Sequence, residues 1–240
     1  MKDAAIIFRI SLKLIKKNLI FYSMIVLLNF SVNIAVNKAL IQFDGSTYNP
    51  KLMFLGLISV LVSWFTYCGT GSAWIYHDLN WKYIARVFKR LPDLLYFGVW
   101  YFFNFTYRIF LLVFPAIQFA LKNFFTVHIL IHENTDLASA RNLSEQLVSS
   151  KKKFIFIFVL IMYSASLWWS VVSLEIFGDS SLRLFAVSCL TAFINISFGT
   201  YYFIMKNAFL KTVEKELLKR SKNEETEHND IPKNDVDEKK

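Results

Sequence analysis

The sequence predicts an all-α protein, a polytopic bundle of about six transmembrane helices, and two observations support this prediction. First, four long stretches contain no Asp, Glu, Lys or Arg: residues 19–37, 52–76, 154–174 and 184–205. Each is about as long as a helix that crosses the ~30 Å hydrocarbon core of a bilayer. Second, Lys and Arg gather between these stretches, which is typical of loops that stay on the cytoplasmic side.

The composition agrees with a chain that is solvated by lipid. Hydrophobic residues make up 55% of the 240 residues and aromatic residues 18%, and Phe alone occurs 25 times. These residues occur in runs and not at the spacing of a half-buried soluble helix, so we expect most of them to face lipid or neighbouring helices. Cys68 and Cys189 fall inside predicted spans, where we expect them to pack as small residues without forming a disulfide or a zinc site.

The segment before the first span predicts an amphipathic helix over residues 3–17. Ile7 and Ile10 lie on its apolar side, and Arg9 and Lys13 are among its cations. Such a helix lies at the level of the headgroups, where its cations meet anionic lipid. The apolar stretch that follows is as long as a full span and has no small-residue cleavage site after it, so we expect it to be retained as a signal anchor.

The charge distribution predicts the topology of the spans. The predicted spans are about 19–42, 52–76, 91–107, 109–131, 154–177 and 183–206. Basic residues are concentrated in segments 1–17, 82–90 and 141–153 and in the tail from residue 206, while the other connections hold few of them. We therefore expect the N-terminus, the two middle basic segments and the C-terminal tail to be cytoplasmic.

Residues 94–131 are ambiguous, because they are apolar almost throughout. Both flanks are basic, so an even number of crossings is expected, and we predict two spans with Arg108 at the external turn and a kink at Pro115 in the second. A tilted or partly re-entrant hairpin is one alternative. A single span at 94–114 followed by a cytoplasmic interfacial helix is another, and it would place the basic tail outside.

Two further cytoplasmic segments have the pattern of interfacial helices. Residues 79–91 and 135–150 combine apolar with basic or polar positions at helical spacing, and Thr135 or Asp136 is placed to cap the second of them. Each of the three amphipathic segments precedes a predicted two-span hairpin. The chain therefore has the pattern of three similar units, and internal repeats of this kind are common in membrane transport folds.

The transmembrane helical domain is predicted to comprise residues 1–222. Residues 206–222 carry mainly basic side chains among their charges and predict a helix that continues out of the last span. Residues 223–240 are acidic and polar with almost no apolar side chains, so they cannot bury enough surface to offset the entropy lost on ordering. We expect this tail to be disordered.

Small and polar residues recur within the apolar spans and provide the candidates for a functional interior. Small residues let helix backbones approach closely, and Ser and Thr form hydrogen bonds across such contacts, so they either pack helices or line a polar path. Ionisable residues at membrane depth are costly and are functional candidates by default. The candidates for a polar interior are Thr70, Ser72, Lys122, His128, Ser164, Ser166, Ser197 and Thr200.

The sequence contains no motif that predicts catalysis, a metal site or a bound cofactor. His128 and His132 are spaced as two ligands on one helix face, with Glu133 beside them, but a third ligand is missing nearby in the sequence. Gly69-x-Gly71 falls at membrane depth, outside the strand–turn–helix context of a nucleotide loop. We therefore expect no enzymatic activity. The rival interpretation is a membrane-embedded lipid enzyme that uses the two histidines and Glu133.

One short motif resembles a known group of membrane proteins. Glu133 is followed by Ala140, Ser144 and Leu147, and then by lysines and another span. This pattern is similar to the element E…A-x-x-x-S-x-x-L of bacterial multi-span membrane proteins. That group includes the membrane domain fused to some glycerophosphodiester phosphodiesterases and related six-span families. The resemblance covers residues 132–206; it implies six spans with both ends cytoplasmic and implies no activity.

These observations predict a multi-pass protein of the inner (cytoplasmic) membrane with two candidate functions. One is a permease-type or transporter-like subunit with partner membrane subunits, and the other is a scaffold or lipid-interacting protein without transport. The even number of spans favours transport, whereas the scarcity of charge at membrane depth disfavours coupled transport. The expected partners are the bilayer and anionic headgroups at its cytoplasmic face, and we expect no nucleic acid partner.

Overall fold

The computed structural model describes residues 2–41, 50–149, 151–178 and 180–229. Every regular element within these ranges is a helix, which confirms the predicted all-α class. Five helical segments of the described chain are long and apolar enough to cross a membrane: Leu19–Leu40, Pro50–Tyr76, Val113–His132, Lys152–Phe177 and Ser181–Lys215. The chain therefore has the element lengths and composition of a membrane protein.

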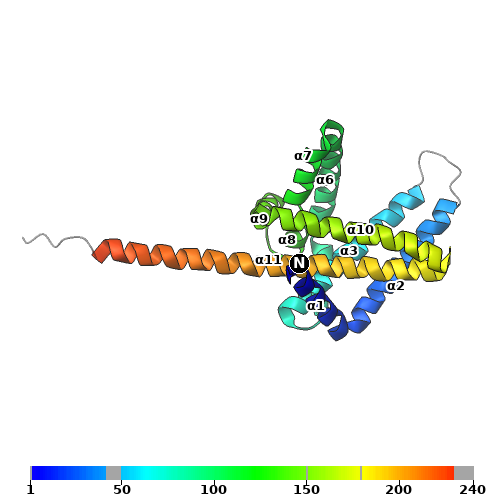
Figure 1. Cartoon of the computed structure of the whole chain (residues 1–240), viewed down its shortest axis with the longest axis horizontal. Coiled ribbons are helices and arrows are strands. Elements are labelled where there is room, and N and C mark those ends of the chain that lie inside the picture. Colours follow the sequence, from blue (N-terminus) through cyan, green and yellow to red (C-terminus); the bar gives the residue numbers. More distant parts are fainter. Residues whose placement is uncertain (1, 42–49, 150, 179, 230–240) are drawn as a thin grey trace, which may run out of the picture. The chain divides into compact units, whose positions relative to one another are not determined.

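The first three helices form a short amphipathic element followed by a hairpin (Figure 1). α1 spans Lys2–Lys17, α2 spans Leu19–Ile41 and α3 spans Pro50–Tyr76. Asn18 separates α1 from α2, and its backbone N–H still donates to Leu14 O at 3.0 Å, so the helical hydrogen bonding continues through the junction. α2 and α3 pack against each other. These helices agree closely with the predicted segments.

The next interfacial segment consists of two short helices. α4 spans Trp81–Ile84 and α5 spans Arg86–Lys89, where the sequence predicts one helix over 79–91. Asn80 caps α4, because its side chain accepts hydrogen bonds from two backbone N–H groups in the first turn of that helix. The prediction of one continuous helix here is therefore wrong, although the segment is helical on both sides of the break.

α6 (Leu91–Leu111) and α7 (Val113–Lys122) form a hairpin in which the two helices pack against each other. The sequence predicts the turn at Arg108. In the structure the extended backbone of Leu112 reverses the chain, so the turn lies four residues further along. Arg108 instead occupies the last turn of α6, with its guanidinium 4.8 Å from the centre of the Phe119 ring on α7. This cation–π contact lies between the two arms and places Arg108 below the tip.

The return arm of the hairpin is broken, although not at Pro115 as predicted. Pro115 lies in the first turn of α7, where its missing N–H leaves no helical hydrogen bond unmade, so it helps to start the helix. The break falls at residues 123–125, after which α8 spans Thr126–His132. At the base of the hairpin, Arg90 donates to Asn134 Oδ1 at 2.8 Å, which joins the start of one arm to the end of the other.

α9 (Leu137–Ser149), α10 (Lys152–Phe177) and α11 (Ser181–Asn229) complete the described chain. Asp136 caps α9, as one of the two predicted alternatives, because its carboxylate accepts hydrogen bonds from two backbone N–H groups of the first turn. Gly178 ends α10 with a φ of 60°, a backbone conformation that glycine adopts without strain. In the described chain, each of the three hairpins thus follows one or two short helices.

α11 is longer than the sequence predicts. It continues through residues 223–229, where the sequence predicts the start of the disordered tail. Three of these seven residues are Glu, which favours a helix even without packing. Residues 230–240, the remainder of the predicted tail, lie outside the described residues. The chain divides into two units, one ending at Phe203 and one beginning at Ile204, and the site described below belongs to the first.

The core of the first unit lies where α3, α8, α9 and α11 meet. Its largest fully buried side chains include Phe125, Ile129, Leu130, Leu147, Ile155, Ile196 and Tyr202. α8 is deeply buried in this core, since Ile129, Leu130 and Ile131 are all at most 1% exposed. The segment that follows the break in the hairpin is therefore enclosed by protein and not by lipid.

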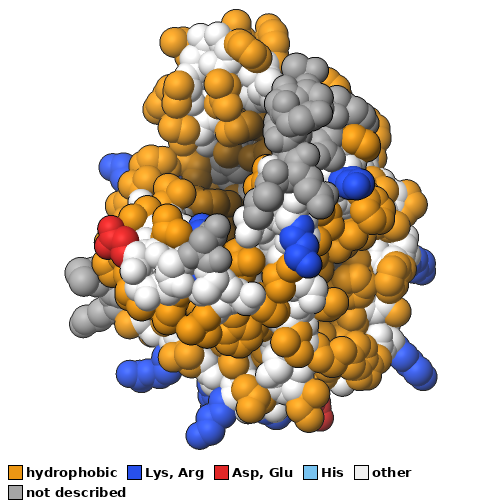
Figure 2. All heavy atoms as spheres, turned by 90° about the vertical axis from the view of Figure 1, so that its right-hand side faces the viewer, with side chains coloured by type: hydrophobic (Ala, Val, Ile, Leu, Met, Phe, Trp, Pro, Cys, Tyr) orange, Lys and Arg blue, Asp and Glu red, His pale blue; other side chains and the backbone are white. Residues whose placement is uncertain are grey.

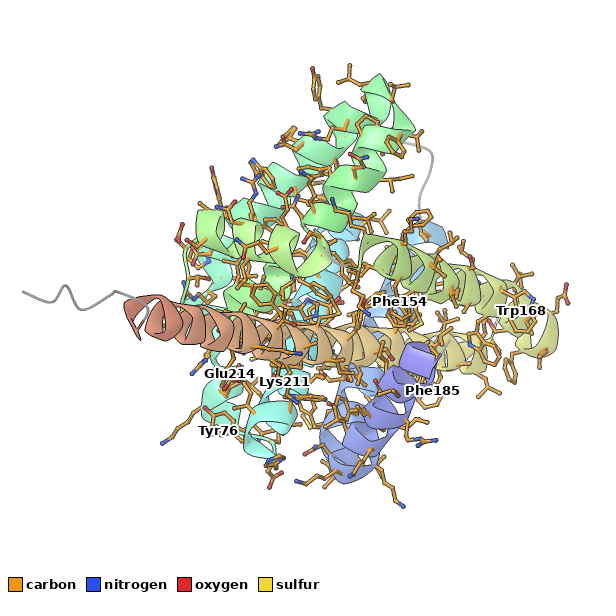
Figure 3. The ribbon with its side chains drawn as sticks, turned by 60° about the vertical axis from the view of Figure 1, so that its left-hand side comes forward. Tyr76, Phe154, Trp168, Phe185, Lys211 and Glu214 are labelled. Atoms are coloured by element: carbon orange, nitrogen blue, oxygen red, sulfur yellow. The ribbon has the colours of Figure 1, made fainter. Side chains whose placement is uncertain are left out.

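Away from this core, large apolar side chains are exposed on every hairpin. Phe110, next to the tip of the α6–α7 hairpin, is 84% exposed, and Trp168 on α10 is 66% exposed. Figure 3 labels Trp168 on its helix. Hydrophobic side chains cover most of the face shown in Figure 2, with Lys and Arg scattered among them. A soluble monomer rarely exposes apolar surface on this scale, so lipid is the solvent that fits these hairpins.

Ser144, which belongs to the short motif shared with other multi-span membrane proteins, joins α9 to the break between α7 and α8. Its buried Oγ donates to Lys122 O at 2.8 Å and accepts from the backbone N–H of Phe125 at 3.1 Å. We expect Ser144→Ala to lower the free energy of unfolding by about 1–3 kcal/mol, because two buried backbone groups lose their partner. Unfolding in mild detergent measures this change. The control is Ser149→Ala, at the exposed end of the same helix, and equal losses in both variants would contradict the assigned role.

Candidate functional site

A buried polar cluster joins α1, α2, α3 and α11. Thr70 Oγ1 on α3 lies 3.4 Å from the Tyr22 hydroxyl on α2. Ser11 Oγ on α1 lies 3.2 Å from Thr200 Oγ1 on α11. α3 and α11 approach closely at this point, because a Cβ added at Gly199 would lie 3.2 Å from Thr70 Cγ2. The structure therefore brings Thr70 and Thr200 together, and the two glycine-threonine pairs of α3 and α11 form a tight helix contact.

Ser72 and Ser197 are also buried, but their hydroxyls serve the local backbone. Ser72 Oγ accepts from the backbone N–H of Asn80 at 2.7 Å and lies 3.3 Å from Asp78 O, so it holds the turn that follows α3. Ser197 Oγ donates to Phe193 O at 2.9 Å within α11. Both side chains stabilise the shape of the core and present no free polar group to a path.

The remaining predicted members lie elsewhere, which corrects the expectation of one common interior. Ser164 is exposed on α10, and Ser166 is partly exposed on the same helix. Lys122, at the end of α7, pairs with Glu145 on α9 at 2.6 Å and does not reach the cluster. A helix that is apolar on all sides gives no sequence cue to which side faces its neighbours, so the sequence could not separate Thr70 from Ser164.

The two histidines and Glu133 lie beside the cluster. The rings of Tyr67, Tyr83, Tyr202 and Phe203 surround the two histidines and form an aromatic cage. His132 Nδ1 is 2.8 Å from the Tyr83 hydroxyl, and burial raises the pKa of Tyr83, so this hydroxyl keeps its proton. The Tyr202 hydroxyl donates to Glu133 Oε1 at 3.0 Å. Each polar group of this pair of contacts is therefore held by a tyrosine from another helix.

His128 differs from the buried Ser and Thr candidates because its polar atoms make no hydrogen bond among the described residues. It is 3% exposed, and neither ring nitrogen has a hydrogen-bond partner among the described residues. Its ring lies against aromatic neighbours instead, with centroid distances of 4.2 Å to Tyr67 and 5.4 Å to Tyr202. In this setting the imidazole packs as a neutral aromatic ring. The described residues contain no group of three or more His, Cys, Asp or Glu placed to hold a metal ion.

The glycines of α3 make room for this aromatic cage. A Cβ added at Gly71 would overlap the ring of His132, and one added at Gly69 would overlap the ring of Phe21. The sequence marks both glycines as part of a small-residue stretch, and the structure shows which rings they admit. The stretch is therefore explained by ring packing across α3.

A second polar site, which the sequence does not predict, lies outside this core. A cavity of about 340 Å³ opens between α6, α7 and α9 and is lined by Arg108, Lys122, Arg141 and Glu145. The predicted candidates include only Lys122 of these four. The pattern that could have found it is the spacing of Trp100, Asn104 and Arg108 on one face of α6, but only the fold brings that face to α9.

Comparison with protein-family models, with curated proteins and with solved structures found no match for this chain.

Proposed function

We propose that the protein is a non-enzymatic, multi-pass scaffold of the inner membrane that acts through contacts with lipid and with partner helices. The observation that carries this proposal is that four of the predicted polar candidates are buried and hydrogen-bonded within the protein. Thr70, Ser72, Ser197 and Thr200 are all fully buried, and each hydroxyl has a partner within the protein. A transport path requires polar groups that face a water-filled interior, whereas Thr70 and Thr200 join helices and Ser72 and Ser197 bind the local backbone.

The topology we propose places α1, α4, α5, α9 and the end of α11 on the cytoplasmic side. Their Lys and Arg content supports this placement. α6 and α7 are the two arms of one hairpin, joined at the base by Arg90 and Asn134. The chain thus leaves this hairpin on the side where it entered, so the number of crossings is even whether or not the hairpin spans the bilayer.

We further infer that the α6–α7 hairpin is re-entrant and that four helices, α2, α3, α10 and α11, cross completely. α9 packs on the middle of the hairpin, where Arg141 lies over Trp100 and Glu145 pairs with Lys122. If α9 lies at the headgroups, only the 10 residues of α7 extend beyond it, a rise of about 15 Å. That is about half of the ~30 Å hydrocarbon thickness.

Cysteine labelling tests this topology. In a chain whose native Cys68 and Cys189 are replaced, we expect Ser180→Cys to react with an impermeant thiol reagent from outside, and Lys13→Cys only after the membrane is opened. Leu112→Cys, at the hairpin tip, should not react from outside. Reaction of Leu112→Cys from outside would instead support six complete spans. Labelling of Lys13→Cys from outside would overturn the proposed orientation.

Purification and flux measurements test the scaffold role itself. Purified in mild detergent, the protein should retain phospholipid and partner membrane chains, and in liposomes it should show no solute flux above that of empty vesicles. Substituting Thr70 and Thr200 together by Val should lower stability without opening any flux. A co-purifying ATPase, or a flux that this double substitution alters while the fold is retained, would favour the permease-type subunit.

A further inference from the structure

The cavity between α6, α7 and α9 has the form of a binding site for an anion. Three cationic side chains, Arg108, Lys122 and Arg141, reach it from three different helices. Glu145 is the one carboxylate among its described lining residues, so two positive charges are left without compensation. Its volume of about 340 Å³ falls within the ~300–1,000 Å³ range of small-molecule pockets.

The two guanidinium groups are held in place but are not neutralised. Arg141 lies 3.9 Å from the centre of the Trp100 ring, and Arg108 lies 4.8 Å from that of Phe119. Ring faces attract a cation and fix its plane, yet they accept no conventional hydrogen bond. The Nε atom of each arginine is buried, and neither has a hydrogen-bond partner within the described part of the chain. Such groups recognise oxyanions through paired N–H donors.

Lys122 differs from the two arginines because it already has a partner. Its Nζ lies 2.6 Å from Glu145 Oε1, and the hydrogen bond from Lys122 holds the pKa of Glu145 below its usual range. The carboxylate is therefore charged at neutral pH and competes for the cavity's positive charge. Removing the charge of Glu145 frees Lys122 as a third cation for the anion. A substitution of Glu145 is therefore predicted to strengthen anion binding.

The surroundings of the cavity indicate a lipid as the source of the anion. A second cavity of about 320 Å³ shares Asn123 with the first and is lined mainly by apolar side chains, among them Phe97, Leu121 and Val159. Large apolar side chains such as Phe110 are also exposed on the same hairpin. A molecule with a phosphate at one end and acyl chains at the other matches a polar cavity that has an apolar cavity next to it. A soluble phosphate would use only the first cavity.

We propose that the α6–α7–α9 cavity binds the phosphate-bearing headgroup of an anionic phospholipid, with an acyl chain in the apolar cavity next to it. Arg108 and Arg141 contact the phosphate oxygens, and Glu145 limits the affinity by holding Lys122. This inference deepens the lipid-interacting role proposed above and rests on it for the source of the anion.

Native mass spectrometry of the full-length protein in mild detergent tests the proposal, with phosphatidylglycerol and phosphatidylcholine as the probes. The wild-type protein should bind one phosphatidylglycerol molecule about tenfold more tightly than phosphatidylcholine. Arg108→Gln and Arg141→Gln should each remove most of this preference. Lys38→Gln is the control, because it removes one exposed cation in the last turn of α2, outside the cavity and outside the amphipathic helices that are expected at the headgroups, and it should leave the preference unchanged.

Glu145→Gln separates binding from folding. It should strengthen phosphatidylglycerol binding several-fold, a gain that a damaged fold cannot produce. The site is overturned if Lys38→Gln reduces the preference as much as Arg141→Gln does, or if Glu145→Gln weakens binding in a protein that melts normally. Displacement of the lipid by millimolar inorganic phosphate would overturn the lipid assignment in favour of a soluble anion. Solute flux through a protein that still binds phosphatidylglycerol selectively would sink the scaffold role and leave this site intact.

Discussion

Gly71→Ala is expected to destabilise the folded protein by about 2–5 kcal/mol, although it adds only one methyl group. The new Cβ would overlap the ring of His132. This ring cannot move aside easily, because Tyr83 bonds to its Nδ1 and the rings of Tyr202 and Phe203 lie against it, the latter with centroids 4.9 Å apart. Either α3 moves away from α8 or the buried Tyr83–His132 hydrogen bond breaks.

The matched control is Gly98→Ala on α6, where nothing lies within 4 Å of the added Cβ. This substitution should leave stability unchanged or raise it by up to about 1 kcal/mol, because alanine favours a helix more than glycine does. Unfolding of both variants by a denaturing detergent, followed from mild detergent, gives the comparison. Similar stability of the Gly71 and Gly98 variants would show that the His132 ring is not fixed against α3.

Composition predicted the long apolar helices well, because an uncharged run of about 20 residues has the length and composition of a membrane-crossing helix. The sequence predicts spans at 19–42, 52–76 and 154–177, and the structure has helices at Leu19–Ile41, Pro50–Tyr76 and Lys152–Phe177. The flanking charges mark these ends, since Lys and Arg are costly inside hydrocarbon. The amphipathic helices before and between the spans follow from their mixture of cations and apolar residues.

Periodicity, by contrast, carries little information within the apolar hairpins. A helix in lipid is apolar on all sides, so neither the turn at Leu112 nor the exposure of Ser164 could be read from the pattern. The break at residues 123–125 depends on Ser144, which is distant in sequence and supplies the missing hydrogen bonds. The cavity was missed for the same reason, because Arg108 and Arg141 meet only through the packing of α9 on the hairpin.

The same limit applies to phenylalanine, which occurs 25 times in the chain with no sequence cue to which copies form the core. Phe125 is fully buried and touches four rings: those of Phe124, His128, Tyr201 and Tyr202. We expect Phe125→Ala to lower the free energy of unfolding by about 3–5 kcal/mol, because the cavity it leaves cannot collapse around rigid aromatic neighbours.

Phe110→Ala removes the same atoms from a side chain that is 84% exposed, and it should change stability by less than about 1 kcal/mol. In lipid or detergent the acyl chains fill the space that the ring leaves, so no cavity forms. Unfolding of the two variants in mild detergent, with the extent of aggregation recorded for each, measures the difference. A loss for Phe110→Ala as large as that for Phe125→Ala would mean that another protein surface covers the hairpin tip. In that case protein, and not lipid, would be the solvent of the exposed apolar surface on α6 and α7.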